Sequence, residues 1–183
     1  MIRKLAILGA IGDLTARYLL PGLAALRAAG ELGNDFQLIG VGRDKWADET
    51  FKNWAAAQLD RHANELPAAA KQAVVATSRY HQADVTDPSS MAAVVQGAEP
   101  LAAYLALPPS VFPGAVSALH RAGTAPRSIV VLEKPFGEDL SGAIALNRLL
   151  SRLYPEQTIF RVDHFLAMKT VQNILGTRLP TEL

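Results

Sequence analysis

The sequence predicts an α/β protein built on a doubly wound, Rossmann-like, mostly parallel sheet with helices on both faces. Continuous apolar runs, which are typical of parallel strands buried on both faces, alternate with segments of helical periodicity. This alternation repeats five or six times along the chain. The first apolar run ends at a glycine and leads directly into a helical segment, which is the strand–turn–helix order of such sheets.

The first half of the chain contains three predicted strands. The apolar run at 5–8 is the first strand, and a helix follows over about 13–29, in which Pro21 marks a kink or the start of a second helix. The apolar stripe of this helix is expected to consist of Leu14, Tyr18, Leu19, Leu23 and Leu26. The next predicted elements are a strand over 36–41, a helix over about 48–64, a weaker helix over 66–78 and a strand over 79–83.

The second half continues the alternation. The apolar run at 101–107 predicts a strand that is closed by two prolines, and strands over 128–132 and 158–162 follow. The predicted helices cover 89–96, about 110–122, 139–153 and 169–175. The helix over 139–153 is expected to bury an apolar stripe made of Leu140, Ile144, Leu146, Leu149 and Leu150.

Composition and charge indicate one globular domain over residues 1–183. Half of the residues are apolar and 19% are charged, and a net charge of +1 excludes a nucleic-acid or anionic-membrane surface built from bulk charge. The chain has no cysteine, which excludes thiolate metal sites and disulfides and fits a reducing compartment. The N-terminal apolar run is shorter than the roughly 7–15 residues of a signal-peptide core, and no run approaches the ~18 of a membrane span. We therefore expect a cytoplasmic protein with no metal, nucleic-acid or membrane partner.

The turn after the first strand reads Gly-Ala-Ile-Gly-Asp-Leu at 9–14. Gly9 permits a sharp turn, Gly12 lets the backbone approach a pyrophosphate, and the first amides of the next helix face that anion. The turn lacks the G-x-G-x-x-G fingerprint, so a purely structural glycine turn is the alternative. Its place after a buried strand favours a dinucleotide site whose candidate residues are Gly9, Ala10, Gly12, Asp13 and Leu14.

The end of the second strand decides which dinucleotide binds. An acidic residue there accepts a hydrogen bond from the ribose 2′-hydroxyl of NAD, whereas an arginine accommodates the 2′-phosphate of NADP. Arg43 and Asp44 stand side by side at this position. Asp44 repels the phosphate if it points inward, and alternatively it faces water as the cap of the next helix. Arg43 favours NADP as the cofactor, with NAD as the alternative.

Two motifs follow later strands. Lys134 lies in the run Glu-Lys-Pro-Phe-Gly at 133–137, at the end of a strand, where its ammonium group can contact phosphate or a sugar hydroxyl. Asp163 and His164 lie in the run Arg-Val-Asp-His-Phe-Leu at 161–166, at the end of the next strand. A surface lysine and a structural Asp-His pair are the simpler interpretations of each motif taken alone.

Together, the turn at 9–14, the lysine motif and the Asp-His motif resemble the amino-terminal NAD(P)-binding domain of the glucose-6-phosphate dehydrogenase family. The resemblance implies oxidation of an aldose 6-phosphate to its 6-phospholactone, with hydride transfer to NADP. It implies that Arg43 holds the 2′-phosphate and that Lys134 lies between nicotinamide and sugar. It further implies that His164 binds the substrate phosphate and that Asp163 orients a catalytic histidine of the second domain. We expect that carboxyl-terminal substrate and dimerisation domain to be absent from this chain.

The chain departs from the family pattern on the substrate side. Family members typically carry Tyr, Gly and Lys where this chain has Phe165, Ala167 and Met168, and many carry Tyr where this chain has Phe112. Losing two groups that hydrogen-bond a phosphate costs on the order of 1–3 kcal/mol each. Lys169 lies about 100° away on a helix and is a poor substitute for the missing lysine. The cofactor half of the pattern is therefore better kept than the sugar-phosphate half.

Three functional interpretations remain open at this point. The chain is the cofactor-binding part of a sugar-phosphate dehydrogenase, or it is a stand-alone or partner-completed dinucleotide-binding protein that has lost that chemistry. The third, an oxidoreductase of the Gfo/Idh/MocA type, fits least well because those proteins carry G-x-G-x-x-G in the first turn. A missing second domain would leave apolar surface exposed, which predicts a homo-oligomer or a complementing chain.

Overall fold

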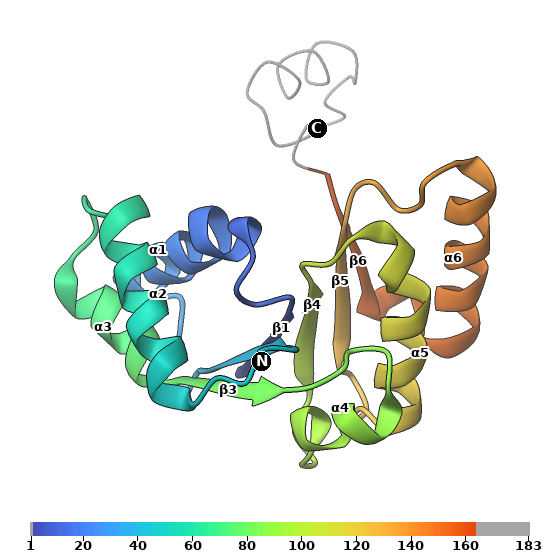
Figure 1. Cartoon of the computed structure of the whole chain (residues 1–183), viewed down its shortest axis with the longest axis horizontal. Helices are drawn as coiled ribbons and strands as arrows, with labels where there is room; N and C mark the ends of the chain where they lie inside the picture. The colour runs from blue at the N-terminus through green and yellow to red at the C-terminus, as the bar shows by residue number, and fades with distance from the viewer. Residues whose placement is uncertain (1, 164–183) are drawn as a thin grey trace, which may run out of the picture.

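The computed structural model describes residues 2–163, which form a six-stranded sheet with helices on both sides (Figure 1). Neighbouring strands are all parallel, and their order across the sheet is β3-β2-β1-β4-β5-β6. The chain thus builds one half of the sheet outward from β1 and then returns to β1 to build the other half, which confirms the predicted doubly wound fold. The strands are β1 (Lys4–Leu8), β2 (Gln37–Gly42), β3 (Ser78–Gln82), β4 (Leu101–Leu105), β5 (Ile129–Glu133) and β6 (Ile159–Val162).

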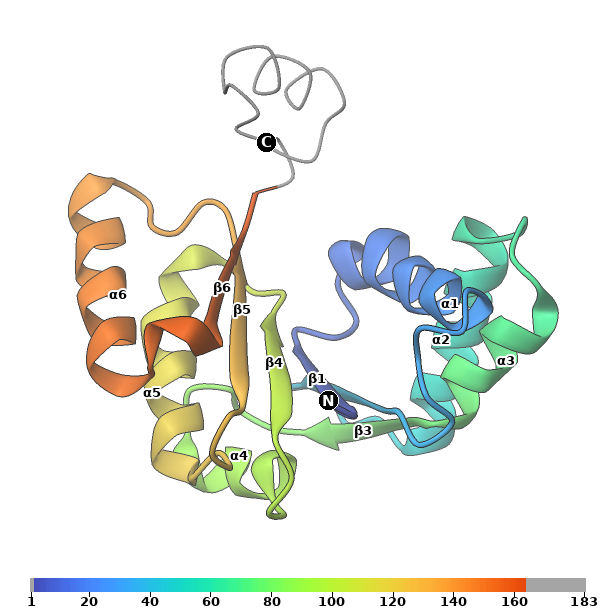
Figure 2. The same ribbon diagram turned by 180° about the vertical axis from the view of Figure 1, so that it is seen from behind.

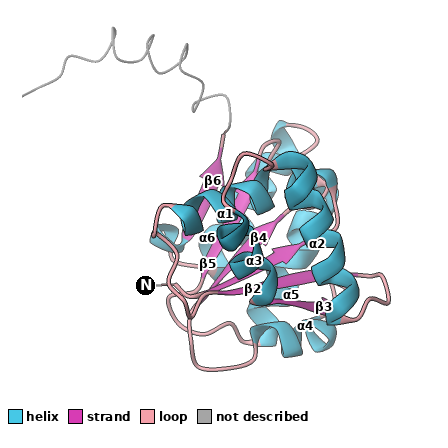
Figure 3. Ribbon diagram, turned by 90° about the vertical axis from the view of Figure 1, so that its left-hand side faces the viewer, coloured by secondary structure: helices cyan, strands magenta, loops and turns pink. Residues whose placement is uncertain are grey.

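The helices divide into two groups that cover opposite faces of the two halves of the sheet (Figures 2 and 3). One group packs on β1–β3, and the other packs on β4–β6 and on the opposite side of β1 and β2. The first group is α1 (Leu20–Ala28), α2 (Asp48–His62) and α3 (Ala68–Ala76); the second is α4 (Pro88–Val95), α5 (Phe112–Ala122) and α6 (Leu140–Leu153). The short helical turns are η1 (Thr15–Leu19), η2 (Pro109–Val111) and η3 (Glu156–Thr158). The helix predicted over 169–175 lies outside the described residues.

The first helix contains a wider turn than its sequence pattern predicts. Residues Thr15–Leu19 form a π-helical segment, and α1 then begins with Pro21 as its second residue, where the missing N–H of proline costs least. This register turns Tyr18 and Leu26 outward, with exposed fractions of 58% and 45%. Their assignment to the buried stripe was therefore wrong, and Leu20 and Ala24 are buried in their place.

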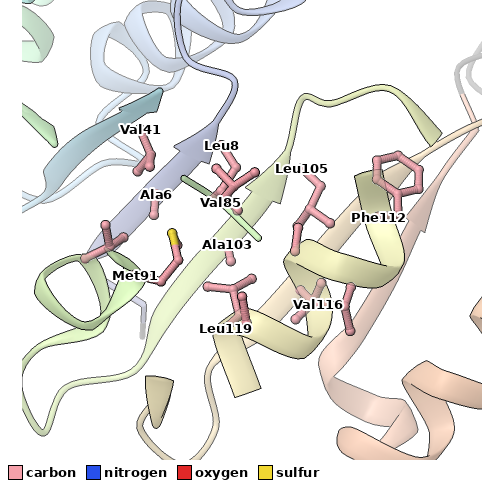
Figure 4. Packing of buried hydrophobic residues seen from close by; sticks show 14 of the residues in the cluster. Ala6, Leu8, Val41, Val85, Met91, Ala103, Leu105, Phe112, Val116 and Leu119 are labelled. Atoms are coloured by element: carbon pink, nitrogen blue, oxygen red, sulfur yellow. The ribbon is translucent and has the colours of Figure 1, made fainter. Parts of the chain in front are cut away.

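Two apolar clusters fill the layers on either side of the sheet. The larger cluster packs α4, α5 and α6 against the central strands, and Figure 4 shows Met91, Phe112 and Leu119 within it. The smaller cluster packs α1 and α2 against β1 and β2 around Phe51 and Leu59. Burying one such side chain contributes about 1.5–3 kcal/mol, so these layers fix where the strand ends lie.

Helix α6 and the face of β5 and β6 on the other side of the sheet are only partly covered. Leu140 and Ile144 are 76% and 44% exposed, so the prediction that they belong to the buried stripe of α6 was wrong. On β6, Phe160 is 49% exposed and points away from the α4–α6 layer, whereas Ile159 is buried in it. The face of β5 and β6 opposite α6 therefore carries partly exposed apolar side chains. Among the residues that the structure describes, no helix combines the length and the apolar character needed to cross a membrane.

Candidate functional site

A cleft of about 480 Å³ lies at the carboxyl ends of the strands, where the strand order reverses between β1 and β4. Ligands of doubly wound sheets bind at such a switch point because the crossovers on either side leave a crevice there. A second cleft of about 220 Å³ shares part of this lining and extends over β5 to Lys134. The residues common to both clefts are Gly12, Ala106, Leu107 and Pro108.

The turn after β1 is shaped by Gly9. Its φ angle is 87°, in the left-handed region that favours glycine, and a Cβ atom there would lie 2.2 Å from the carbonyl oxygen of Ala106. The backbone N–H groups of Gly9 and Ala10 donate to the carbonyl of Val41 at 2.9 and 3.1 Å, which ties the turn to the end of β2. The structure therefore explains why a glycine stands at the first position of the predicted cofactor turn.

The remaining residues of the turn reach the clefts in different ways. Gly12 lines both clefts, and its carbonyl accepts the first helical hydrogen bond, from Ala16 at 3.1 Å. Asp13 and Leu14 line the second cleft. Ala10 is fully buried, packs in the smaller core cluster and lines neither of these two clefts. The first amides of the helix thus lie beside the cleft, in the arrangement that suits an anion.

Arg43 and Asp44 follow β2 and line the larger cleft. The alternative in which Asp44 caps the next helix was wrong, because the N-cap position of α2 is Ala47 and no side chain caps that end. Burial and then the negative charge of Asp44 raise the pKa of Tyr80. The side-chain amide of Gln82 donates to the carbonyl of Arg43 at 3.1 Å and holds this end of the strand in place.

Two groups of cleft residues had no place in the sequence-based site. Asp84, Val85 and Thr86 follow β3, and Ala106, Leu107 and Pro108 follow β4. Their only signal in the sequence was their position at or just after the end of a predicted strand, since the carboxyl ends of all parallel strands meet at one edge of the sheet. The strand predicted over 101–107 ends earlier, at Leu105. Applying that rule to every strand, and not only to those followed by a motif, would have found them.

Lys134 and Asp163 are brought together at the ends of β5 and β6. The ammonium nitrogen of Lys134 lies 2.5 Å from Oδ2 of Asp163, and the backbone N–H of Lys134 donates to the carbonyl of Val162 at 3.3 Å. The Lys134 side chain is 57% exposed, whereas that of Asp163 is 14% exposed. Lys134 also lines the second cleft, and the peptide bond that follows it is cis. His164 lies outside the described residues.

Glu133 adds a second carboxylate beside Lys134. It lines the second cleft and accepts a hydrogen bond from the hydroxyl of Tyr104 on the neighbouring strand. Burial and then this hydrogen bond raise the pKa of Tyr104, which therefore stays protonated as a donor at neutral pH. Within residues 2–163, no group of three or more His, Asp or Glu side chains is arranged to hold a metal ion.

Comparison with known proteins gives a consistent picture. Residues 6–173 match the family described as "Glucose-6-phosphate dehydrogenase, NAD binding domain". Glucose-6-phosphate 1-dehydrogenase of Zymomonas mobilis is 33% identical over 100% of this chain and 39% of its own length. The enzyme of the same name from Bacillus subtilis is 34% identical over 93% of this chain and 37% of its own length. The chain thus spans well under half the length of these relatives.

Solved structures agree with the sequence relatives. Glucose-6-phosphate 1-dehydrogenase from Mycobacterium avium superposes with a TM-score of 0.82 and 28% identity, over 94% of this chain and 41% of that one. A glucose-6-phosphate dehydrogenase in complex with its substrate glucose-6-phosphate also gives a TM-score of 0.82, with 29% identity over 97% of this chain and 40% of that one. The myo-inositol 2-dehydrogenase from Lactobacillus plantarum, at 16% identity and a TM-score of 0.53, shares the fold alone.

Proposed function

The chain belongs to the glucose-6-phosphate dehydrogenase family, and from this premise we propose that it is the dinucleotide-binding part of an NADP-dependent aldose 6-phosphate dehydrogenase. One observation carries the proposal. Two adjoining clefts that share Gly12 run from the Gly9–Gly12 turn to Lys134, whose ammonium group contacts Asp163. A cofactor laid along it would place its reactive ring beside the residues that the family resemblance assigns to the sugar. Residues 1–183 would then form one dinucleotide-binding domain.

The cofactor end of this proposal rests on the turn and on β2. Gly9 keeps Cβ atoms out of the space beside Ala106, and Gly12 with the amides around Asp13 and Leu14 would hold a pyrophosphate. Ala10 would contribute by packing beneath the turn. Arg43 lines the cleft where the adenosine ribose would lie and would hold the 2′-phosphate of NADP. The bound nicotinamide would supply the hydride acceptor.

The sugar end rests on Lys134 and Asp163. Lys134 would donate hydrogen bonds to the sugar, since its ammonium group is exposed at the second cleft. Asp163, which is mostly buried, would hold Lys134 and orient the catalytic histidine that the family carries in its second domain. His164 would bind the substrate phosphate, as the family resemblance implies. These roles stay predictions.

The exposed face of β5 and β6 supports a second candidate function. A stand-alone or partner-completed dinucleotide-binding protein would keep the cofactor cleft and use this face to contact a second domain, a second copy or another chain. The polar groups lost at Phe165 and Met168 favour the same interpretation. The phenylalanine at Phe112 does not favour this second function, because it is 2% exposed and packs in the core, where a tyrosine hydroxyl would need a hydrogen-bond partner. A cytoplasmic location stays a prediction.

Calorimetric titration of the chain with NADP and with NAD, each with and without glucose 6-phosphate, tests the proposal. We expect NADP to bind, and a Gly12→Ala variant to bind more weakly because its methyl group occupies the path of the pyrophosphate. Gly22→Ala is the matched control, since Gly22 lies in α1 with open space around it. Tighter NADP binding in the presence of the sugar phosphate would show that Lys134 and Asp163 still form a substrate site. Failure of both dinucleotides to bind would overturn the proposed function.

A further inference from the structure

The end of the larger cleft beside β2 and β3 carries an unusual charge balance for a site that receives NADP. The charged residues of its lining are Arg43, Asp44 and Asp84, one cation against two carboxylates. The 2′-phosphate of NADP carries about two negative charges at neutral pH, whereas NAD has an uncharged hydroxyl at that position. The lining therefore opposes the 2′-phosphate by charge, even though Arg43 is present to receive it.

Asp84 keeps its negative charge at neutral pH. Its Oδ1 accepts hydrogen bonds from the backbone N–H of Thr86 at 2.9 Å and from the Thr86 hydroxyl at 2.7 Å. These two bonds, with a smaller contribution from the charge of Arg43, hold the pKa of Asp84 below its usual range. Arg43 and Asp84 line the same cleft, so the ionised carboxylate offsets part of the guanidinium charge before any ligand arrives.

Asp44 lines the cleft just beyond the position where Gly42 packs against Tyr80. Gly42 leaves room for the Tyr80 hydroxyl, which would lie 2.6 Å from a Cβ atom at that position. Asp44 follows two residues later and is exposed, and its negative charge acts on the Tyr80 hydroxyl. Since Asp44 does not cap α2, its carboxylate is available at the end of β2, where an acidic residue accepts a hydrogen bond from the ribose 2′-hydroxyl.

We propose that Asp44 sets the cofactor choice of this chain. Its carboxylate accepts a hydrogen bond from the ribose 2′-hydroxyl of NAD, and it repels the 2′-phosphate of NADP that Arg43 attracts. The chain then binds NAD about as tightly as NADP. This inference rests on the proposed function, because it requires a dinucleotide in the cleft. Asp84 strengthens the effect by offsetting Arg43, but its bonds to Thr86 also hold the loop after β3, so Asp44 is the cleaner site for a test.

The test measures dissociation constants of NAD and NADP by titration of the unaltered chain and of three variants. Asp44→Asn removes the charge and keeps the shape of the side chain. Asp60→Asn is the matched control, because it removes the same charge near the carboxyl end of α2, at a carboxylate paired with Lys71. Arg43→Gln removes the attraction for the phosphate. Thermal unfolding of each variant confirms that it is folded.

We expect the two dissociation constants of the unaltered chain to lie within about tenfold of each other. Asp44→Asn should shift their ratio by roughly tenfold toward NADP, since one charge about 6 Å from a dianion in a water-exposed cleft is worth about that factor. Arg43→Gln should weaken NADP more than NAD, and Asp60→Asn should leave the ratio unchanged. If Asp44→Asn leaves the ratio of the two dissociation constants unaltered, or shifts it no more than Asp60→Asn does, the inference is overturned. The proposed function still stands in that case, provided that NADP binds. If neither dinucleotide binds, both fall together.

Discussion

At the residue scale, the site depends on positions where a single atom decides the geometry. Gly9 combines a left-handed φ angle with a carbonyl oxygen 2.2 Å from where its Cβ would lie. Gly30 has a similar φ angle of 77°, but nothing lies within 4 Å of its missing side chain. The two glycines therefore separate the cost of backbone conformation from the cost of a steric clash.

We predict that Gly30→Ala lowers the free energy of unfolding by about 1–2 kcal/mol, the usual cost of placing an alanine in the left-handed region. Gly9→Ala should cost clearly more, because the Ala106 carbonyl must also move, and it should abolish NADP binding. Urea denaturation of both variants, with NADP titration, measures the two effects. Equal destabilisation by both substitutions would show that the backbone around Ala106 moves at little cost. The short distance to the Ala106 carbonyl would then not explain the glycine at position 9.

The Lys134–Asp163 pair matters through its geometry more than through stability. Because Lys134 is 57% exposed, water and salt screen the pair, and its contribution to folding is about 0–1 kcal/mol. A short contact with so small a contribution is better explained by positioning. It holds an ammonium group at the rim of the second cleft, where the proposed substrate would lie.

At the scale of elements, the helices α4 and α6 begin at carboxylate caps. Asp87 accepts from the backbone N–H groups of Ser89 and Ser90 at the start of α4. Asp139 accepts from the backbone N–H of Gly142 and from the Ser141 hydroxyl at the start of α6. These bonds stabilise the ionised form of Asp139 and hold its pKa below the usual value of 3.8. Helix α6 thus has a pH-dependent first turn just after the lysine motif.

The lowered pKa of Asp139 predicts the pH range in which its cap acts. The folded state binds the proton less readily than the unfolded state, so the cap contributes its full stability above pH 3.8 and loses it as the pH falls through the lower, folded pKa. We expect Asp139→Asn to be less stable than the unaltered chain at pH 6, and the difference to shrink below about pH 4. Urea denaturation between pH 3 and pH 6 measures this.

Glu138→Gln is the matched control for that series, because it removes the neighbouring charge and leaves the bond to Gly142 in place. If both variants show the same pH dependence, the effect comes from net charge and the capping role of Asp139 is wrong.

At the scale of the whole molecule, the two helix layers leave one part of the sheet open. Helices α1–α3 cover β1–β3 on one face, and α4–α6 cover the other half on the opposite face (Figure 1). The uncovered face of β5 and β6 presents Phe160 at the edge of the sheet. An exposed edge strand with an apolar side chain readily pairs with another surface.

We predict that the 183-residue chain self-associates through this face. Phe160→Lys should shift the chain toward the monomer by placing a charge on the edge strand. Tyr18→Lys is the matched control, since Tyr18 is 58% exposed on the π-helical segment. Sedimentation velocity over a range of concentrations measures the effect. A chain that stays monomeric at all concentrations, or equal behaviour of the two variants, would contradict the prediction.

Local sequence patterns were enough to predict the fold class and most residues of the proposed site. Hydrophobic periodicity is a local property, so the alternation of strands and helices could be read directly, and parallel strands in that order place their carboxyl ends at one edge. That rule placed the turn at Gly9, Arg43 and Lys134 at the clefts where the structure finds them. The need for glycine at the first turn could also be predicted, because few other residues adopt a left-handed backbone conformation.

Which of these residues contact each other, and which faces of the sheet stay uncovered, depends on tertiary packing and could not be predicted from local patterns. The contact between Lys134 and Asp163 depends on the pairing of β5 with β6, and the presence of Asp84 beside Arg43 depends on the pairing of β2 with β3. Periodicity shows that a helix has an apolar side but not how far its partner reaches, so Tyr18 and Leu140 were assigned to the core and are exposed. Local pattern specifies elements, whereas packing between distant segments specifies their contacts.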